Sequence, residues 1–156
     1  MGTASTTDPT TGVTATVTWV EQSSKNDIAL ARLDTTVTGI TPLALNTAKP
    51  VRGQVLAFAG WGATSSAGAP SDQLWWGKVK VSTVRTYTVQ VVGHWPYPDT
   101  SACPYDSGAP YFTETSPPQL VSVENNGPSC PHNQQETTAR VDPIISWVKG
   151  IVTDLP

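Results

Sequence analysis

The stretch CPYDSGAP, residues 103–110, places a cysteine, two prolines and a glycine around a single serine. Proline and glycine favour turns, so the Asp-Ser-Gly at its centre predicts a tight turn with Ser107 at the bend. A serine in such a turn is either an ordinary turn residue or a nucleophile. A hydroxyl is a poor nucleophile until a base removes its proton, so the choice depends on partners elsewhere in the chain.

Two other short stretches supply candidate partners. In NDIAL, residues 26–30, one carboxylate, Asp27, stands directly before an apolar run, and AGWG, residues 59–62, follows an apolar strand. A neutral imidazole that acts as a base needs a buried carboxylate to fix its tautomer and stabilise its charged form. We interpret Asp27 as that carboxylate, with a turn or N-cap aspartate as the alternative. At the serine turn, the N–H groups of Tyr105 and Ser107 are expected to converge on a developing oxyanion.

The rest of the chain favours an all-β fold. Thr and Val are abundant, 14 Pro and 12 Gly punctuate the 156 residues, and β-branched residues pack well on pleated surfaces. Period-two alternation and apolar runs between turn signals predict strands at 13–19, 54–60, 78–82, 86–91 and 119–123. Asp142 and Pro143 precede apolar residues at helical spacing, which predicts a short C-terminal helix with Asp142 as N-cap and Pro143 in the first position.

Charge and cysteine content narrow the function. The net charge is −3 and only 13% of residues are charged, so we expect no nucleic-acid partner. No apolar run is long enough to span a bilayer, and no membrane partner is expected. The two cysteines, Cys103 and Cys130, indicate a disulfide in an exported protein, with two buried free thiols as the alternative. Together with His94 and His132 they match no metal-ligand spacing, so neither metal nor cofactor is expected.

The three motifs, their order and spacing, the cysteine pair and the terminal helix together resemble the trypsin/chymotrypsin-like serine proteases, most closely the secreted bacterial branch. The resemblance runs from about Val13 to the C-terminal helix. It implies an all-β, chymotrypsin-like double β-barrel with the second barrel complete and the first partial. On this basis 1–12 is a disordered or appended start, 13–62 the remainder of the N-terminal barrel with the inter-barrel segment, and 63–156 the C-terminal barrel.

The resemblance also implies roles for individual residues. Asp27 and Ser107 are the catalytic residues, the N–H groups of Tyr105 and Ser107 form the oxyanion hole, and Cys103 pairs with Cys130. The primary specificity pocket has Ser101 near its floor and a wall made of Asn125, Asn126 and Gly127. Because Ser101 is neutral, the pocket is expected to admit apolar or medium-sized side chains rather than basic ones. The implied setting is a secreted protease acting on polypeptides.

The chain departs from the family in the residue that would act as the general base. Family members carry a histidine well before the aspartate, whereas only 26 residues precede Asp27 here and none is histidine. We therefore expect the histidine-bearing part and most of the first barrel to lie upstream, with His94 and His132 away from the cleft. The expected function is a serine endopeptidase that is inactive as this isolated chain. The alternative is a non-catalytic, protease-like binding module. Uncovered strand edges predict self-association or a partner chain that covers them.

Overall fold

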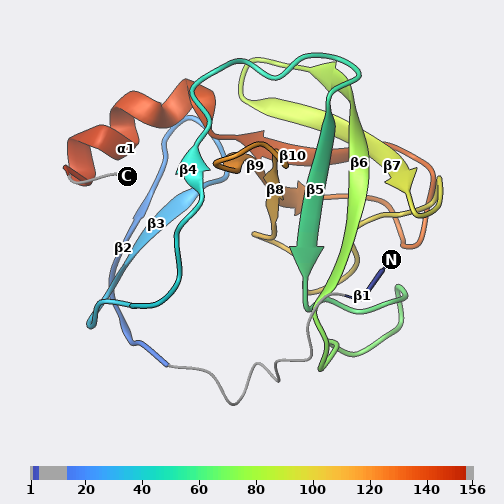
Figure 1. The fold of residues 1–156 in the computed structure, drawn as a ribbon, viewed down its shortest axis with the longest axis horizontal. Helices are drawn as coiled ribbons and strands as arrows, with labels where there is room; N and C mark the ends of the chain where they lie inside the picture. Colours follow the sequence, from blue (N-terminus) through green and yellow to red (C-terminus); the bar gives the residue numbers. More distant parts are fainter. Residues whose placement is uncertain (1, 4–13, 154–156) are drawn as a thin grey trace.

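The computed structural model describes residues 2–3 and 14–153 and is almost entirely β-structure (Figure 1). In chain order the elements are β1 (Gly2–Thr3), β2 (Val17–Gln22), β3 (Ala29–Leu33), β4 (Ala44–Leu45), β5 (Val55–Gly60), β6 (Trp75–Val84), β7 (Thr88–Trp95), β8 (Pro110–Phe112), β9 (Gln119–Asn126), β10 (Glu136–Arg140), the 3-10 helix η1 (Asp142–Ile144) and α1 (Ile145–Ile151).

Six strands close into a barrel. Antiparallel pairing runs in the order β6, β5, β8, β9, β10 and β7, and β7 pairs again with β6, so the sheet has no free edge along this path. Side chains alternate between the interior and the surface along each strand, and the inward ones form the core. This core comprises Leu56, Phe58, Val79, Val81, Val89, Val91, Ala102, Tyr111 and Val121.

The barrel begins earlier in the chain than the sequence predicts. β5 pairs with β6 on one side and β8 on the other, and its Leu56 and Phe58 are fully buried in the core. The boundary expected after residue 62 therefore lies before residue 55, and β5 belongs to the C-terminal barrel. β4, further upstream, also attaches to this barrel through a parallel pairing with β9.

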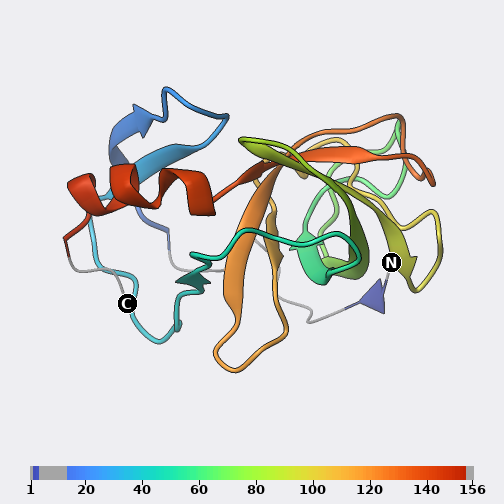
Figure 2. The ribbon, with the colours of Figure 1, turned by 90° about the horizontal axis from the view of Figure 1, so that it is seen from above.

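β2 and β3 form a separate two-stranded hairpin, which lies to one side of the barrel together with α1 (Figures 1 and 2). A half-buried first strand and a buried strand after Asp27 were expected, and both expectations are wrong. All six residues of β2 and four of the five in β3 are exposed to solvent. The hairpin is tied to the remainder by Asn26 Nδ2, which donates to the Arg140 carbonyl at 2.7 Å, and by Trp147 Nε1, which donates to Glu21 at 3.3 Å.

The other strand predictions hold with shifted ends. The strands expected at 54–60, 78–82, 86–91 and 119–123 correspond to β5, β6, β7 and β9. β8 and β10 were not predicted. β8 has only three residues, which are too few to show a period. The sequence of β10, ETTAR, lacks an alternation of apolar and polar residues.

The C-terminal helix is present, but its first turn is a 3-10 turn and its cap differs from the prediction. Val141 is the N-cap residue, and no side chain caps the helix. Asp142 instead accepts hydrogen bonds from Arg140 Nε and Nη2 at 3.0 and 2.5 Å, because the buried guanidinium is its nearest strong donor. Within the described ranges, no helix is long and apolar enough to cross a membrane.

Two residues of the start that was expected to be disordered or appended lie in a short strand. Gly2 and Thr3 form β1 and pair with Trp76 and Trp75 of β6. The remainder of that prediction, residue 1 and residues 4–12, lies outside the described residues.

Candidate active site

The turn that carries Ser107 is anchored on both sides by backbone hydrogen bonds. The Asp106 N–H donates to the Cys103 carbonyl at 3.1 Å, and the Ala109 N–H donates to the Asp106 carbonyl at 2.8 Å. The Gly108 N–H reaches across to the Glu124 carbonyl on β9 at 2.9 Å. Ser107 itself is exposed, so the turn presents its hydroxyl at the surface of a fixed loop.

Two N–H groups of this turn donate no hydrogen bond within the described part of the chain, those of Tyr105 and Ser107. Their neighbours at 106, 108 and 109 all donate, so the two unused donors are the pair that the sequence analysis assigned to the oxyanion hole. Tyr105 has a φ of 76°, a left-handed conformation that favours glycine. The turn thus has the backbone that a glycine would adopt, with a tyrosine in its place.

Replacing Tyr105 with glycine is expected to stabilise the chain. The side chain is 66% exposed and loses little packing, whereas the left-handed conformation costs a non-glycine residue about 1–2 kcal/mol. Part of this gain is offset by the larger entropy of glycine in the unfolded state, which leaves a net increase in the free energy of unfolding of about 0.5–1 kcal/mol. Urea denaturation of the variant and the parent would measure it, and Tyr97→Gly, at an exposed position without a positive φ, should be neutral or destabilising.

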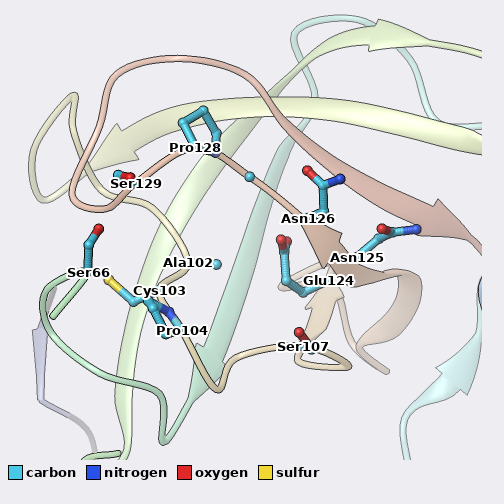
Figure 3. A pocket seen from close by; sticks show the side chains of 11 residues that line it. Ser66, Ala102, Cys103, Pro104, Ser107, Glu124, Asn125, Asn126, Pro128 and Ser129 are labelled. Carbon is cyan, nitrogen blue, oxygen red and sulfur yellow. The ribbon is translucent and has the colours of Figure 1, made fainter. Parts of the chain in front are cut away.

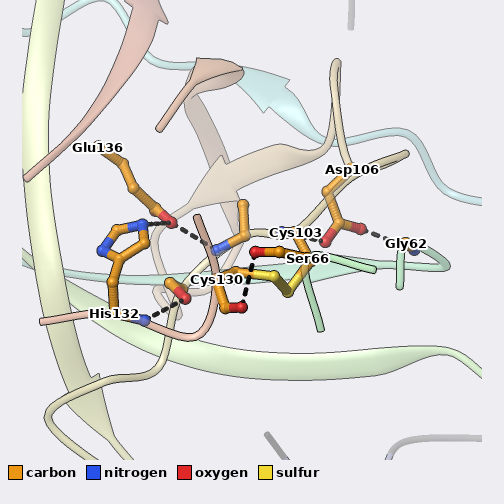
Figure 4. The surroundings of a disulfide bond; sticks show 9 residues. Gly62, Ser66, Cys103, Asp106, Cys130, His132 and Glu136 are labelled. Atoms are coloured by element: carbon orange, nitrogen blue, oxygen red, sulfur yellow. Dashed lines mark hydrogen bonds and ion pairs between the residues drawn. A yellow bond between two sulfur atoms is a disulfide. The ribbon is translucent and has the colours of Figure 1, made fainter. Parts of the chain in front are cut away.

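The carboxylate of Asp106 holds the turn from within (Figure 4). It accepts hydrogen bonds from the Gly62 N–H at 2.8 Å and the Cys103 N–H at 3.0 Å. Burial raises the pKa of Asp106, while these two N–H groups act in the opposite direction. A Cβ on Gly62 would lie 2.3 Å from the Asp106 Cγ, so this close approach requires glycine there. Two backbone amides thus hold Asp106.

The predicted disulfide between Cys103 and Cys130 is present, which excludes the free-thiol alternative. Both sulfurs are largely buried beside Ala63, and Ser66 donates to the Cys130 carbonyl from its N–H at 3.1 Å and from its hydroxyl at 2.9 Å. The bond therefore connects the serine turn to the segment after β9 and fixes the distance between them (Figure 4).

Ser107 lies between two cavities. One, of about 300 Å³, is shared with Tyr105 and with residues 59–61. The other, of about 320 Å³, has the serine turn on one side and β9 with its following loop on the other (Figure 3). It is lined by Ser66, Ala102, Cys103, Pro104, Ser107, Glu124, Asn125, Asn126, Gly127, Pro128 and Ser129. We name this second space the 107–127 cavity.

The 107–127 cavity brings together most of the predicted pocket but not its floor. Asn125, Asn126 and Gly127 line it beside Ser107, as the sequence analysis expected. Ser101 does not line it: this residue is buried, its hydroxyl accepts a hydrogen bond from the His132 N–H at 3.2 Å, and it borders a different cavity, together with Tyr97. The polarity of Ser101 therefore does not set the polarity of the 107–127 cavity.

A buried acidic cluster that the sequence analysis missed lies behind this cavity. The Tyr111 hydroxyl is 2.8 Å from Glu124 Oε2 and 3.0 Å from Glu136 Oε2, and Glu136 Oε1 accepts from the Ala102 N–H at 2.5 Å. Both carboxyl groups are more than nine-tenths buried. The available signal was position, since Glu124 follows Ser122 at a spacing of two along β9 and both residues are buried.

Burial dominates the titration of this cluster. It raises the pKa of Glu124 to about 7, with the charge of Asp106 adding to the effect. It raises the pKa of Glu136 to about 8, and the charge of Glu124 adds to it. The pKa of Tyr111 is also raised well above its usual range, first by burial and then by the two glutamates. The Tyr111 hydroxyl has one proton for two carboxyl neighbours, so full hydrogen bonding requires a proton on one of the carboxyl groups.

The predicted base partners are not assembled. Asp27 is exposed, accepts no hydrogen bond from the described residues and lines neither cavity beside Ser107. His94 is exposed on β7, and His132 is buried with its Nδ1 accepting from the Gln134 N–H at 3.2 Å. Burial lowers the pKa of His132. Neither histidine hydrogen bonds to Ser107, and no group of three or more potential metal ligands occurs among the described residues.

A closed six-stranded barrel, with an exposed serine in a disulfide-tied turn beside two unused backbone donors, defines a serine hydrolase fold of the chymotrypsin type. The family comparison agrees with this class. The Trypsin family model matches residues 3–148, which is most of the chain. The chain therefore belongs to the trypsin family of serine proteases.

Individual relatives support the same assignment. Trypsin alpha-3 of Lucilia cuprina is 33% identical over 146 residues, covering 79% of this chain and 81% of that protein. Trypsin alpha-4 of the same organism is 32% identical over 146 residues, covering 79% of this chain and 52% of that protein. The branch expected from the motifs, a secreted bacterial one, stays a prediction.

Solved structures share the fold. Human heparin binding protein superimposes with a TM-score of 0.76 at 20% identity, covering 91% of this chain and 68% of that chain. An atomic resolution structure of HBP gives a TM-score of 0.75 at 20% identity, with the same coverage. At this identity the likeness concerns the fold alone.

Proposed function

We propose that Ser107 is the nucleophile of a serine endopeptidase and that the N–H groups of Tyr105 and Ser107 bind the oxyanion of its tetrahedral intermediate. The observation that carries this proposal is the pair of N–H groups without a partner, in a turn whose other amides all donate. Hydrolysis would proceed by acyl transfer through the Ser107 hydroxyl, with a polypeptide as substrate. In this proposal the 107–127 cavity, walled by Asn125, Asn126 and Gly127, receives the substrate side chain before the cleaved bond.

Activation of Ser107 needs a base, and neither His94 nor His132 hydrogen bonds to it. We therefore propose that the base is a histidine that residues 1–156 do not contain, and that Asp27 orients it. The exposed carboxylate of Asp27, with no hydrogen-bond donor from the described residues, is free to accept a ring N–H. As an isolated chain the protein is then expected to hydrolyse peptides very slowly.

Imidazole supplied from solution tests this arrangement. Labelling of the purified chain with a fluorophosphonate probe should be slow alone and faster with added imidazole, because the free ring replaces the missing base. Rescue by 1-methylimidazole should be weaker, since that ring has no N–H for Asp27 to accept. Mass spectrometry of the labelled protein measures the rate and locates the adduct.

Matched serine variants decide whether the reaction is specific. Ser107→Ala should abolish labelling, whereas Ser129→Ala, at a serine lining the same cavity, should leave it unchanged. Asp27→Asn should reduce the rescue by imidazole and leave the unassisted rate as it was. Equal labelling of Ser107→Ala, or none in the folded parent chain at any imidazole concentration, would contradict the proposal.

A non-catalytic, protease-like binding module is the second candidate. It is favoured by the exposed position of Asp27 and by the lack of a hydrogen bond between Ser107 and either histidine among the described residues. The solved structures of this fold include one named for heparin binding. A net charge of −3 argues against a polyanion as the partner of this chain. Failure of every labelling experiment above, with the fold intact, would support this candidate.

We also propose that the protein acts outside the cell. A disulfide persists in oxidising compartments, and the resemblance of the chain's motifs to secreted bacterial proteases points to the same setting. Reduction and thiol counting on the protein purified without reductant would test this, since free thiols in the native protein would argue for a reducing compartment.

The β2–β3 hairpin is expected to mediate self-association unless another chain covers it. Val17 and Val20 are 50% and 58% exposed, and Leu33 on the neighbouring strand is 41% exposed. Apolar groups on an uncovered hairpin favour association. Size-exclusion chromatography with light scattering should therefore give a mass above 16.5 kDa that rises with concentration.

A charge on the hairpin should restore the monomer. Val20→Lys is expected to shift the distribution towards 16.5 kDa, whereas Val51→Lys, at an equally exposed valine outside the hairpin, should not. A parent chain that stays monomeric at all concentrations and melts cooperatively would show that the exposed hairpin needs no cover.

A further inference from the structure

We propose that Asn126 is a site of spontaneous modification, at which the backbone nitrogen of Gly127 attacks the Asn126 side chain and the amide is converted into a carboxylate. Both residues lie in the wall of the 107–127 cavity. The reaction needs only water and the chain itself, so the inference does not depend on the proposed hydrolysis. Its product is a new negative charge beside the exposed serine turn.

The first step is the sequence at the site. A backbone nitrogen can attack the side-chain carbonyl carbon of the asparagine before it and close a five-membered ring. A side chain on the attacking residue crowds this ring closure, and glycine has none. Asn126 is the one asparagine in the chain that is followed by glycine, so it has the least hindered nucleophile. The asparagines of the chain are Asn26, Asn46, Asn125, Asn126 and Asn133.

The second step is that both reacting groups are free. Among the described residues, the Gly127 N–H donates no hydrogen bond, and the Asn126 side chain neither donates nor accepts one. Both residues are exposed, so water reaches them. Figure 3 shows the Asn126 amide at the end of β9, where the chain turns towards Pro128. No hydrogen bond of these two groups has to break before the nitrogen approaches the carbonyl carbon.

Two other asparagines show the opposite arrangement. Asn26 Nδ2 donates to the Arg140 carbonyl at 2.7 Å, and Asn46 Nδ2 donates to the Ala48 carbonyl at 2.6 Å. Each of these amides would have to give up its hydrogen bond before a ring could close, and each is followed by a residue with a side chain. The same chain thus contains held amides with which the free amide of Asn126 can be compared.

The third step is the freedom of the backbone. The pairing of β9 with β10 is regular from Ser122 to Glu124 and then shifts register, so that Asn125 is skipped and Asn126 lies opposite Thr137. Such a bulge leaves one residue unpaired and disrupts the ladder locally. Asn126 is therefore held by a single pair at the end of the strand, where local opening costs little free energy. The backbone there can adopt the geometry that ring closure requires.

The fold itself requires the glycine. A Cβ on Gly127 would lie 2.9 Å from Glu136 Cγ, which is too close for two carbon atoms. Glu136 cannot move aside cheaply, because it is buried and its carboxyl group is hydrogen-bonded to the Ala102 N–H and the Tyr111 hydroxyl. The packing that excludes a side chain at position 127 therefore keeps the reactive pair in the cavity wall.

The reaction is a ring closure followed by a hydrolysis, with water as the co-reactant and no oxidation or reduction. The Gly127 nitrogen loses its proton and forms a bond to Asn126 Cγ, and Nδ2 takes up a proton and leaves as ammonia. Water then opens the succinimide ring at one of its two carbonyl carbons. Cleavage of the new bond to Cγ gives aspartate. Cleavage of the original peptide bond gives isoaspartate, whose backbone runs through Cβ and Cγ.

Both products change the 107–127 cavity. Of the 11 residues that line it, Glu124 is the one with a charged side chain, and a carboxylate at position 126 adds a second acidic group. Isoaspartate also adds a methylene group to the backbone between β9 and Cys130, which the disulfide ties to the serine turn. The cavity wall therefore changes in charge, and in part of the molecules in length, as the protein ages.

Peptide mapping of the aged chain tests the inference. The purified chain is incubated in mildly alkaline buffer, reduced and cleaved after glutamate, which releases residues 125–136 as one peptide. Mass spectrometry should show this peptide gaining the mass difference between a hydroxyl and an amino group, and fragmentation should locate the change at Asn126. Asn125 and Asn133, in the same peptide, should stay unmodified. An isoaspartyl methyltransferase with a labelled methyl donor should mark the aged chain and not the fresh one.

Variants and an unfolded control decide whether the folded structure permits the reaction. Asn126→Gln should abolish the modification, because the longer side chain would have to close a larger and slower-forming ring, and Asn125→Gln should leave it unchanged. The folded parent chain should react within about tenfold of the rate in urea, because opening at a strand end costs little. Modification in urea with none in the folded chain, or equal modification of Asn133, would overturn the inference. The comparison on the parent chain needs no variant to fold and no labelling of Ser107.

Discussion

Raising the pH from about 6.5 to about 9 should lower the free energy of unfolding by several kilocalories per mole. The cause is the buried pair Glu124 and Glu136, whose pKa values of about 7 and about 8 lie above the ordinary value of 4.5. Between about pH 4.5 and about pH 7 the unfolded chain has lost both protons while the folded chain still holds them. The stability that these groups contribute is complete below the unfolded pKa and is lost as the pH rises through the folded ones.

The magnitude follows from proton linkage, in which each pKa unit between the folded and unfolded states corresponds to about 1.4 kcal/mol. Both glutamates are more than nine-tenths buried, so little of this effect is screened by solvent. The lowered pKa of His132 produces the opposite trend, but only below its ordinary value of 6.5, which is why the series starts there. Urea denaturation at a series of pH values measures how steeply the free energy of unfolding changes with pH.

Variants with uncharged glutamine in place of the glutamates identify the source of this pH dependence. In Glu124→Gln/Glu136→Gln the dependence on pH should largely disappear, because no buried carboxyl group remains behind the cavity to titrate in this range. Glu114→Gln, at the surface, should retain the slope of the parent chain. A stability that is constant or rises between pH 6.5 and 9 would show that the two glutamates are already ionised in the folded state.

Removing the disulfide is the second change with a large expected effect. The bond joins Cys103 and Cys130, which are 27 residues apart in sequence. Opening a loop of this length adds chain entropy to the unfolded state that corresponds to about 3–4 kcal/mol on the loop-entropy model. For a single domain this is a large share of the total stability. Cys103→Ala/Cys130→Ala should therefore unfold at a much lower urea concentration than the parent.

The consequence should extend to the cavity, because the disulfide holds its two walls together. Pro104 follows one cysteine and Ser129 precedes the other, and both line the 107–127 cavity. Labelling of Ser107 by the fluorophosphonate probe should therefore slow in the double variant even where it remains folded. Reduction of the parent chain with dithiothreitol should reproduce both effects without altering the sequence. A loss of stability below about 1 kcal/mol would indicate that the unfolded chain is already compact in this region.

Much of the barrel was predictable because its strands carry local signals. β5, β6, β7 and β9 all combine β-branched or aromatic residues with period two or an apolar run, and their interiors are where they were expected. β10 was not predictable in this way, because its buried residues include Glu136, Thr138 and Arg140, whose burial depends on partners from other strands. The exposure of β2 also escaped prediction, since a period of two shows that a strand has two faces but not that either is covered.

The sequence by itself determined the class of the protein. Its evidence consists of short-range patterns: the serine turn, the cysteine pair, the AGWG stretch and the terminal helix. Each can be interpreted from the residues that favour turns and from residue spacing, without knowledge of the rest of the molecule. Only the tertiary structure decided the polarity of the 107–127 cavity. Closure of the barrel brings Glu124, Tyr111 and Glu136 together from three strands and keeps Ser101 out, because the wall that each side chain faces depends on register and strand order. Those long-range pairings, and the burial that raises the pKa values, cannot be read from the neighbours of a residue along the chain.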